Sequence, residues 1–257
     1  MTAQALETSQ FTLVSRIDGA SNDVFLASLD DTGAQVVYKP VSGERELWDF
    51  PTGSLAGREV ATYLLSDALG LDVVPRTVWR AQGPLGPGSL QELVEVDAQA
   101  PDAVTLLSAP DLDARYLVVA QLEDRSGGQW LLAHEQHPDI RRLAILDVLV
   151  NNADRKAGHV LAAAGRRYLG IDHGVCWHEE SKLRTVLWGW AGDALEDDES
   201  EHLHSQLGKL PDVKELFLQH ISKREWNAFM RRYELMCEQR AMPLPHDDWP
   251  VLPWPLF

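Results

Sequence analysis

Two aspartates of this chain have the surroundings that phosphoryl transfer requires. Asp154 follows an apolar stretch, and Asp172 opens an Asp-x-Gly tripeptide farther along the chain. Enzymes that move a phosphoryl group from ATP use one aspartate to orient or deprotonate the acceptor. They use a second, on an Asp-x-Gly turn, to hold the metal ion that bridges the nucleotide phosphates. Either motif alone is an ordinary turn, but the two together indicate a phosphotransferase in which Asp154 is catalytic and Asp172 binds metal.

The residues around the two aspartates predict a helix, a loop and a hairpin. In residues 139–150 apolar side chains recur at helical spacing, so a helix there would deliver Asp154 onto a loop. Residues 160–163 and 167–171 then have the composition of two strands joined by a glycine-containing turn. This order places Asp172 at the exit of the second strand.

The N-terminal part of the chain predicts a strand-rich unit. Residues 11–39 form a meander of three strands, separated by polar turns, that ends on Lys39. Ser54 is suited to cap the next helix, which carries Glu59, and Gly70 is suited to end it. Two further strands are expected, around residues 73–79 and 89–95.

The rest of the chain gives weaker signals. Two helices are expected near residues 211–220 and 223–240, and the acidic run 196–201 is typical of a solvated loop. Trp188-Gly189-Trp190 is either core packing or a platform for an acceptor. Residues 243–257, rich in Pro and Trp, show no helix or strand pattern.

Composition limits the partners and the location. The chain has 257 residues and a formal net charge of -16, which disfavours nucleic acids and anionic membranes because both attract basic patches. Two cysteines imply no disulfide framework. Neither a signal segment nor a long apolar run is apparent. We therefore expect a cytoplasmic protein without stable membrane association; its oligomeric state is open.

The motifs resemble those of the phosphatidylinositol 3- and 4-kinase superfamily, to which HipA-like serine kinases are neighbours, and most closely an actinobacterial branch of kinase-like proteins. The catalytic loop of that superfamily reads Asp-Arg-His-x-x-Asn, and residues 154–159 occupy this frame. Its metal turn matches Asp172-His173-Gly174. The resemblance implies an α+β fold of the two-lobed, protein-kinase-like type, with a strand-rich N-terminal lobe (residues 1–95) and a mainly helical C-terminal lobe (residues 96–257).

The resemblance also implies a nucleotide site. Lys39 would contact the phosphates of ATP and be held by Glu59, although a strand lysine also deters aggregation and a glutamate early in a helix is favoured by the dipole. The turn 19–23 would cover the phosphates through backbone N–H groups and the Ser21 hydroxyl. Adenine would lie against an inter-lobe hinge whose expected cofactor-binding residues are Gln91, Glu92 and Leu93.

Two positions depart from the superfamily pattern. His159 replaces the metal-binding asparagine, and it either binds the second metal ion or hydrogen-bonds the loop. Imidazole is a softer ligand than an amide oxygen, so Mn²⁺ would suit this site better than Mg²⁺. Lys156 replaces a histidine, and it either meets the transferred phosphate as a catalytic residue or faces solvent.

The expected function is transfer of the ATP γ-phosphate to a hydroxyl acceptor, with Mg²⁺ or Mn²⁺ as cofactor. The strongly acidic chain fits a protein or soluble metabolite as acceptor better than a membrane lipid. Nucleotidyl transfer is an open variant of the same chemistry. The alternatives are a non-catalytic kinase-like nucleotide-binding or scaffold protein and a metal-dependent hydrolase, the latter without a compact ligand motif such as HExxH.

Overall fold

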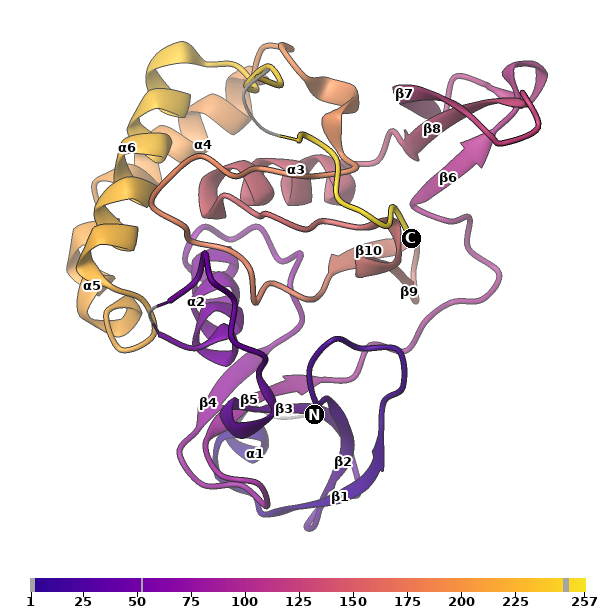
Figure 1. Ribbon diagram of the computed structural model, residues 1–257. Coiled ribbons are helices and arrows are strands. Elements are labelled where there is room, and N and C mark those ends of the chain that lie inside the picture. Colours follow the sequence, from indigo (N-terminus) through magenta and orange to yellow (C-terminus); the bar gives the residue numbers. More distant parts are fainter. Residues whose placement is uncertain (1–2, 52, 247–249) are drawn as a thin grey trace.

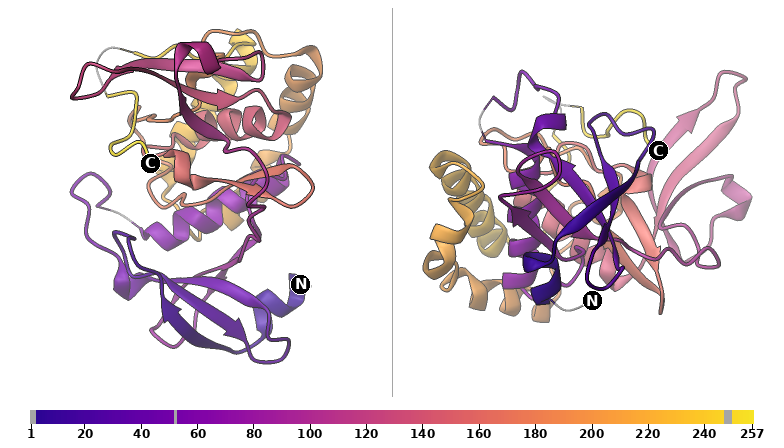
Figure 2. Two further views of the ribbon diagram at one scale, coloured as in Figure 1. Left: turned by 90° about the vertical axis from the view of Figure 1, so that its right-hand side faces the viewer. Right: turned by 90° about the horizontal axis from the view of Figure 1, so that it is seen from below.

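The computed structural model describes residues 3–51, 53–246 and 250–257. Over these residues the fold is mixed α+β, with three antiparallel sheets and six α-helices. Figure 1 shows the N-terminal sheet at one end of the molecule and most of the helices at the other. The left view in Figure 2 shows the long helix α2 (Leu55–Ala68) lying between them.

The N-terminal sheet contains five antiparallel strands in the order β1-β2-β3-β5-β4. The predicted meander is confirmed, and its third strand carries Lys39. A small apolar core on this sheet includes Leu6 from the short helix α1 (Ala3–Thr8) and the ring of Tyr38. The strand expected from residue 73 begins only at Thr77. The bounds are β1 Phe11–Arg16, β2 Phe25–Leu29, β3 Gln35–Pro40, β4 Thr77–Arg80 and β5 Gly88–Glu92.

Helix α2 begins and ends as the sequence predicts. The Ser54 hydroxyl accepts a hydrogen bond from the backbone N–H of Gly57 at 2.9 Å, which satisfies a donor that the first helical turn leaves free. Gly70 follows the helix with φ of 60°, a left-handed conformation that glycine adopts at little cost. The side chains of Leu65 and Leu69 are fully buried in the larger of the two cores.

A second sheet was not predicted. Three antiparallel strands in the order β6-β8-β7 project from the side of the molecule (Figure 1). The part of the chain expected to be mainly helical therefore contains five strands, counting the hairpin β9–β10. The bounds of this sheet are β6 Val104–Leu107, β7 Tyr116–Glu123 and β8 Gln129–Glu135.

The remaining helices enclose the larger core, where the rings of Trp177, Phe217 and Phe229 pack together. The expectation of a solvated loop at residues 196–201 is wrong, because this run forms the start of α4, where acidic side chains favour the positive end of the helix dipole. The helices near 211 and 223 are confirmed. The bounds are α3 Pro138–Val150, β9 Val160–Ala163, β10 Arg167–Gly170, α4 Asp197–Leu207, α5 Leu210–Phe217 and α6 Lys223–Gln239.

None of the helices in residues 3–51, 53–246 and 250–257 combines the length and apolar character needed to cross a bilayer.

Candidate functional site

The loop that carries Asp154 begins where α3 ends. Asn151 ends the helix in a left-handed conformation, with φ of 55°. The next residue, Asn152, fixes the loop through both ends of its amide. Its Nδ2 donates to Asp147 Oδ1 at 2.9 Å, and its Oδ1 accepts from the backbone N–H of Asp154 at 3.0 Å. The predicted helix thus delivers Asp154 to a loop of defined shape.

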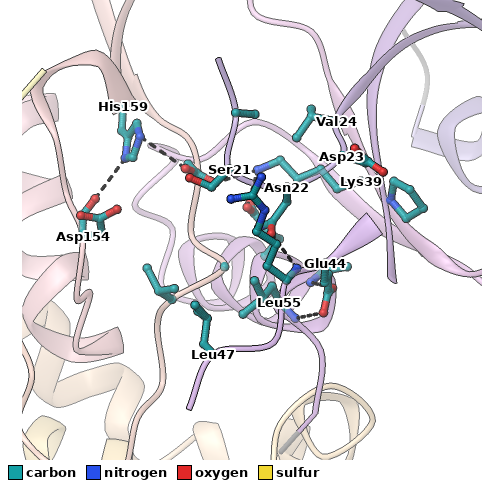
Figure 3. Close-up of a pocket in the computed structure, with 18 of the residues that line it drawn as sticks. Ser21, Asn22, Asp23, Val24, Lys39, Glu44, Leu47, Leu55, Asp154 and His159 are labelled. Atoms are coloured by element: carbon teal, nitrogen blue, oxygen red, sulfur yellow. Dashed lines mark hydrogen bonds and ion pairs between the residues drawn. The ribbon is translucent and has the colours of Figure 1, made fainter. Parts of the chain in front are cut away.

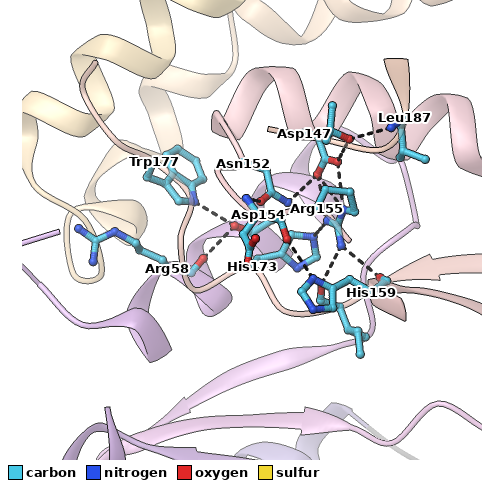
Figure 4. Close-up of polar contacts among 12 residues, drawn as sticks. Arg58, Asp147, Asn152, Asp154, Arg155, His159, His173, Trp177 and Leu187 are labelled. Atoms are coloured by element: carbon cyan, nitrogen blue, oxygen red, sulfur yellow. Dashed lines mark hydrogen bonds and ion pairs between the residues drawn. The ribbon is translucent and has the colours of Figure 1, made fainter. Parts of the chain in front are cut away.

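Arg155 anchors the same loop from inside the protein (Figure 4). Its side chain is completely buried, and its Nε and Nη2 lie 3.0 and 2.9 Å from the two carboxylate oxygens of Asp147. Nη1 donates to the backbone carbonyls of His159 and Ile171, at 3.1 and 2.7 Å. A buried charge is tolerated only with such pairing, so Arg155 joins the loop, α3 and the end of β10 into one unit.

The turn Asp172-His173-Gly174 is positioned by the same guanidinium. His173 is fully buried, and its Nε2 lies 2.6 Å from Arg155 Nη2. Burial, reinforced by the charge of Arg155, lowers the pKa of His173 well below its usual value, so the ring is neutral and Nε2 accepts the hydrogen bond. Asp172, immediately before it, has φ of 60°. This backbone conformation gives the turn its sharp shape.

Lys39 connects three elements. Its ammonium group forms an ion pair with Glu59 Oε1 on α2, and it lies 3.1 Å from Asp172 Oδ1 on the turn 172–174. Burial alone would lower the pKa of Lys39, but the attraction of the two carboxylates outweighs this and raises it. Lys39 also lowers the pKa of Asp172. The lysine is therefore charged and the aspartate ionised at neutral pH.

His159 lies beside the same aspartate. Its Nδ1 is 3.1 Å from the backbone carbonyl of Asp154, which only accepts hydrogen bonds, so Nδ1 carries the proton. The pKa of His159 is lowered by burial, although Asp172 opposes this, so the ring is neutral. The lone pair of Nε2 then faces Asp172 Oδ2 at 3.3 Å. Adjacent ligand positions on a divalent ion lie about 3 Å apart when each metal–ligand distance is roughly 2.1 Å. The separation of Nε2 and Oδ2 therefore suits two neighbouring ligands of one ion.

No group of three or more His, Cys, Asp or Glu side chains in the described part of the chain is arranged to hold a metal ion. The donor set of Asp172 and His159 fits an ion that takes its other ligands from phosphate oxygens and water, as Mg²⁺ commonly does in nucleotide sites. It fits a closed structural metal site poorly, because such a site takes four protein ligands.

Lys156 does not simply face solvent. Its ammonium nitrogen lies 2.9 Å from Asp154 Oδ2, and both side chains are partly buried. The carboxylate of Asp154 therefore faces a cation on one side. Since both belong to the same loop, the pair moves with it.

These side chains meet in one cavity of about 420 Å³ (Figure 3). The turn 19–23, with Ser21, forms one wall, and the two aspartate-bearing segments form another. Besides Asp23, eight of the side chains that line the cavity carry a charged or an imidazole group: Lys39, Glu44, Arg45, Glu59, Asp154, Lys156, His159 and Asp172.

The expected hinge residues do not line this cavity. The side chain of Gln91 is buried in the sheet, where its Nε2 donates to Thr77 Oγ1 at 2.8 Å. Glu92 and Leu93 line a separate cavity of about 330 Å³ against β10. The structure thus brings together seven of the predicted site residues, and it leaves three apart: Gln91, Glu92 and Leu93.

Several residues of the site escaped the sequence analysis. Glu44 and Arg45 come from the segment between β3 and α2, which has no motif. Asp147 does have a sequence signal, because it interrupts the apolar face of a predicted helix and a buried aspartate needs a partner.

The end of the chain also reaches the site. The backbone N–H of Ala157, in the loop that carries Asp154, donates to the carbonyl of Leu256 at 2.8 Å. The carbonyl of Val251 accepts from the N–H of Thr185 at 3.1 Å and from Trp188 Nε1 at 2.8 Å. Trp190 is buried against the ring of His134, which supports core packing for that tryptophan.

No protein-family model matches this chain. It is 41% identical over 263 residues to Protein Rv2133c of Mycobacterium tuberculosis, an alignment that covers 98% of this chain and 94% of that protein. Identity at this level over nearly the full length of both proteins means that the chain belongs to the same family as Protein Rv2133c.

Proposed function

We propose that this protein is an ATP-dependent phosphotransferase with a two-lobed, protein-kinase-like fold divided near residue 95. The observation that carries the proposal is the double contact of Lys39, which pairs with Glu59 on α2 and with Asp172 on the metal turn. Asp154 lines the same cavity. Phosphoryl transfer needs these parts together, because catalysis depends on positioning and on neutralising phosphate charge.

In this proposal the phosphates of ATP lie between Lys39 and the turn that carries Ser21. Lys39 neutralises phosphate charge, and Glu59 keeps its ammonium group in place. This proposal does not place the adenine on Gln91, because its amide is committed to Thr77, and Glu92 and Leu93 line a separate cavity.

Asp172 and His159 would hold Mg²⁺ or Mn²⁺. When bound, the ion would neutralise the negative charge that develops on the phosphates during transfer. The protein contributes a neutral His159, with its proton on Nδ1, and an ionised Asp172.

Asp154 would orient the acceptor hydroxyl. As the acceptor oxygen forms its bond to the γ-phosphorus, the bond to the leaving ADP oxygen breaks and the hydroxyl proton passes to Asp154. Lys156, 2.9 Å from Asp154, would attract the transferred phosphate. The acceptor is a protein or metabolite hydroxyl, in keeping with the net charge of -16.

A non-catalytic nucleotide-binding module is the second candidate. The observation that favours it is the contact between His159 Nδ1 and the Asp154 carbonyl, which gives His159 a structural role without a metal ion. In that case the protein binds ATP without consuming it.

Calorimetric titration with ATP in Mg²⁺, in Mn²⁺ and with a chelator tests the proposal. We expect binding that requires a divalent ion, followed by slow release of ADP. Binding without any ADP release, even with a screen of hydroxyl acceptors, would favour the module. Absence of binding in all three conditions would reject both candidates.

A further inference from the structure

We propose that Arg45 is a second cation, besides Lys39, that receives the polyphosphate part of the ligand in this cavity. The inference deepens the proposed function, and for ATP as ligand it rests on it. Arg45 lies in the segment between β3 and α2, outside every motif in the sequence.

The charges of the cavity single out this arginine. Three cationic side chains line it, since the ring of His159 is neutral: Lys39, Arg45 and Lys156. Lys39 is shared between two carboxylates, and Lys156 is paired with Asp154. Over the residues that the structure describes, the Arg45 guanidinium has no carboxylate within ion-pair distance. It is therefore the lining cation whose charge is not already balanced by a neighbour.

The backbone of Arg45 is held firmly against the turn opposite. Its N–H donates to Asn22 Oδ1 at 2.9 Å, and the N–H of Asp23 donates to the Gly43 carbonyl at 2.9 Å. A Cβ added to Gly43 would lie 2.4 Å from Asp23 Cβ, so the two segments are in close contact. The guanidinium thus extends from a fixed point beside Ser21 and the turn.

Glu44, the residue before Arg45, holds this segment against the start of α2. Its two carboxylate oxygens accept from the backbone N–H groups of Leu55 and Ala56, at 2.9 and 2.8 Å. These donors begin α2 and would otherwise attract an anion. Because Glu44 already accepts hydrogen bonds from these two N–H groups, Arg45 is, in the described part of the chain, the unpaired positive group available to a phosphate in the cavity.

The chemistry of arginine suits such a ligand. A planar guanidinium donates two parallel hydrogen bonds to phosphate oxygens and stays charged at any physiological pH. The recognised class is thus a di- or triphosphate group. A monophosphate offers fewer oxygens and less charge at this end of the cavity.

The test compares Arg45→Gln with Arg125→Gln, a charge-matched control on the exposed turn between β7 and β8. Calorimetry in Mg²⁺ uses three ligands: ATP, AMP and inorganic tripolyphosphate. We expect Arg45→Gln to weaken ATP and tripolyphosphate binding by about tenfold or more, and AMP binding by less than about twofold. Arg45→Lys should recover part of the loss. Thermal unfolding should be unchanged, because the side chain is exposed.

The outcomes separate the two proposals. Equal loss for AMP and ATP, or no loss for ATP, overturns the role of Arg45 while the nucleotide site stands. If the protein binds tripolyphosphate through Arg45 but does not bind ATP, this inference is supported and the proposed kinase function is rejected. A wild-type protein that binds none of the three ligands rejects both.

Discussion

Arg58 of α2 and Glu225 of α6 form an ion pair in which both side chains are buried, with Nη2 of the arginine 2.6 Å from Oε1 of the glutamate. The same glutamate caps α6, since its Oε2 accepts from the backbone N–H of Ser222 at 2.7 Å. Glu59, the partner of Lys39, is the next residue after Arg58. The helix that holds the lysine of the sheet is therefore fastened to the helices at the other end of the molecule.

Breaking this pair should cost much of the stability. We expect Arg58→Leu to lower the free energy of unfolding by about 3–5 kcal/mol, because it leaves Glu225 buried and charged without its partner. Urea unfolding measures the change. The double variant with Glu225→Gln, which keeps an oxygen for the α6 cap, should recover part of the loss. A double variant no more stable than Arg58→Leu would show that packing, rather than the ion pair, is lost.

Substitutions of Asp154 and Asp172 should affect ATP binding and turnover differently. Asp154→Asn is expected to keep metal-dependent ATP binding and to reduce ADP release by about 100-fold or more, because it removes the group that takes the acceptor proton. Asp172→Asn should instead abolish the dependence of ATP binding on metal. Calorimetry and an ADP-release assay measure the two quantities, with the exposed Asp212→Asn as control. Wild-type turnover in Asp154→Asn would contradict the assigned role.

The variant His159→Asn tests the metal preference of the site. We expect His159→Asn to reduce the ratio of ATP affinity in Mn²⁺ to that in Mg²⁺ by roughly threefold or more, because an amide oxygen is a harder ligand than imidazole. His204→Asn, on the exposed side of α4, is the matched control. An unchanged ratio would mean that His159 serves only the hydrogen bond to the Asp154 carbonyl.

Most of the site was predictable because its chemistry lies in short motifs. Asp154 and Asp172 each sit in a local pattern, and Lys39 and Glu59 sit on elements whose periodicity is clear. The side chain of Gln91 could not be placed, because a strand residue faces one side or the other according to register, and here the register pairs it with Thr77. Arg45 reaches the cavity only through contacts with distant residues.

The fold was predictable in the same uneven way. The capped helix α2 and the hairpin β9–β10 have strong local signals, whereas β6 to β8 form a sheet whose strands are partly exposed and lack a regular alternation. The register of β7 and β8 also shifts between Val118 and Ala120, which breaks the period of two on which strand prediction depends.

Stability should depend on pH through His134. Burial lowers the pKa of this histidine to about 4, while Nδ1 donates to the Glu135 carbonyl and Nε2 accepts from the Gly189 N–H. The unfolded chain takes up a proton near pH 6.5 and the folded chain only near pH 4. This contribution to stability is therefore complete above pH 6.5 and is lost as the pH falls toward 4, by about 3 kcal/mol.

The variant His134→Gln isolates this effect because glutamine does not titrate. We expect the variant to be less stable than the wild type at pH 7.5 and the difference to shrink steadily as the pH approaches 4. Reversible urea unfolding at a series of pH values measures it. Parallel curves for the two proteins would show that His134 takes up its proton at the same pH in the folded and the unfolded chain.

The hydrogen bond from Ala157 to Leu256 has a consequence for biosynthesis. A ribosome makes the loop that carries Asp154 about a hundred residues before it makes the Leu256 carbonyl that completes it, at roughly 5–20 residues per second. The nascent chain therefore spends several seconds with this loop lacking one of its backbone restraints. The loop therefore acquires its full set of backbone restraints only after Leu256 has been made.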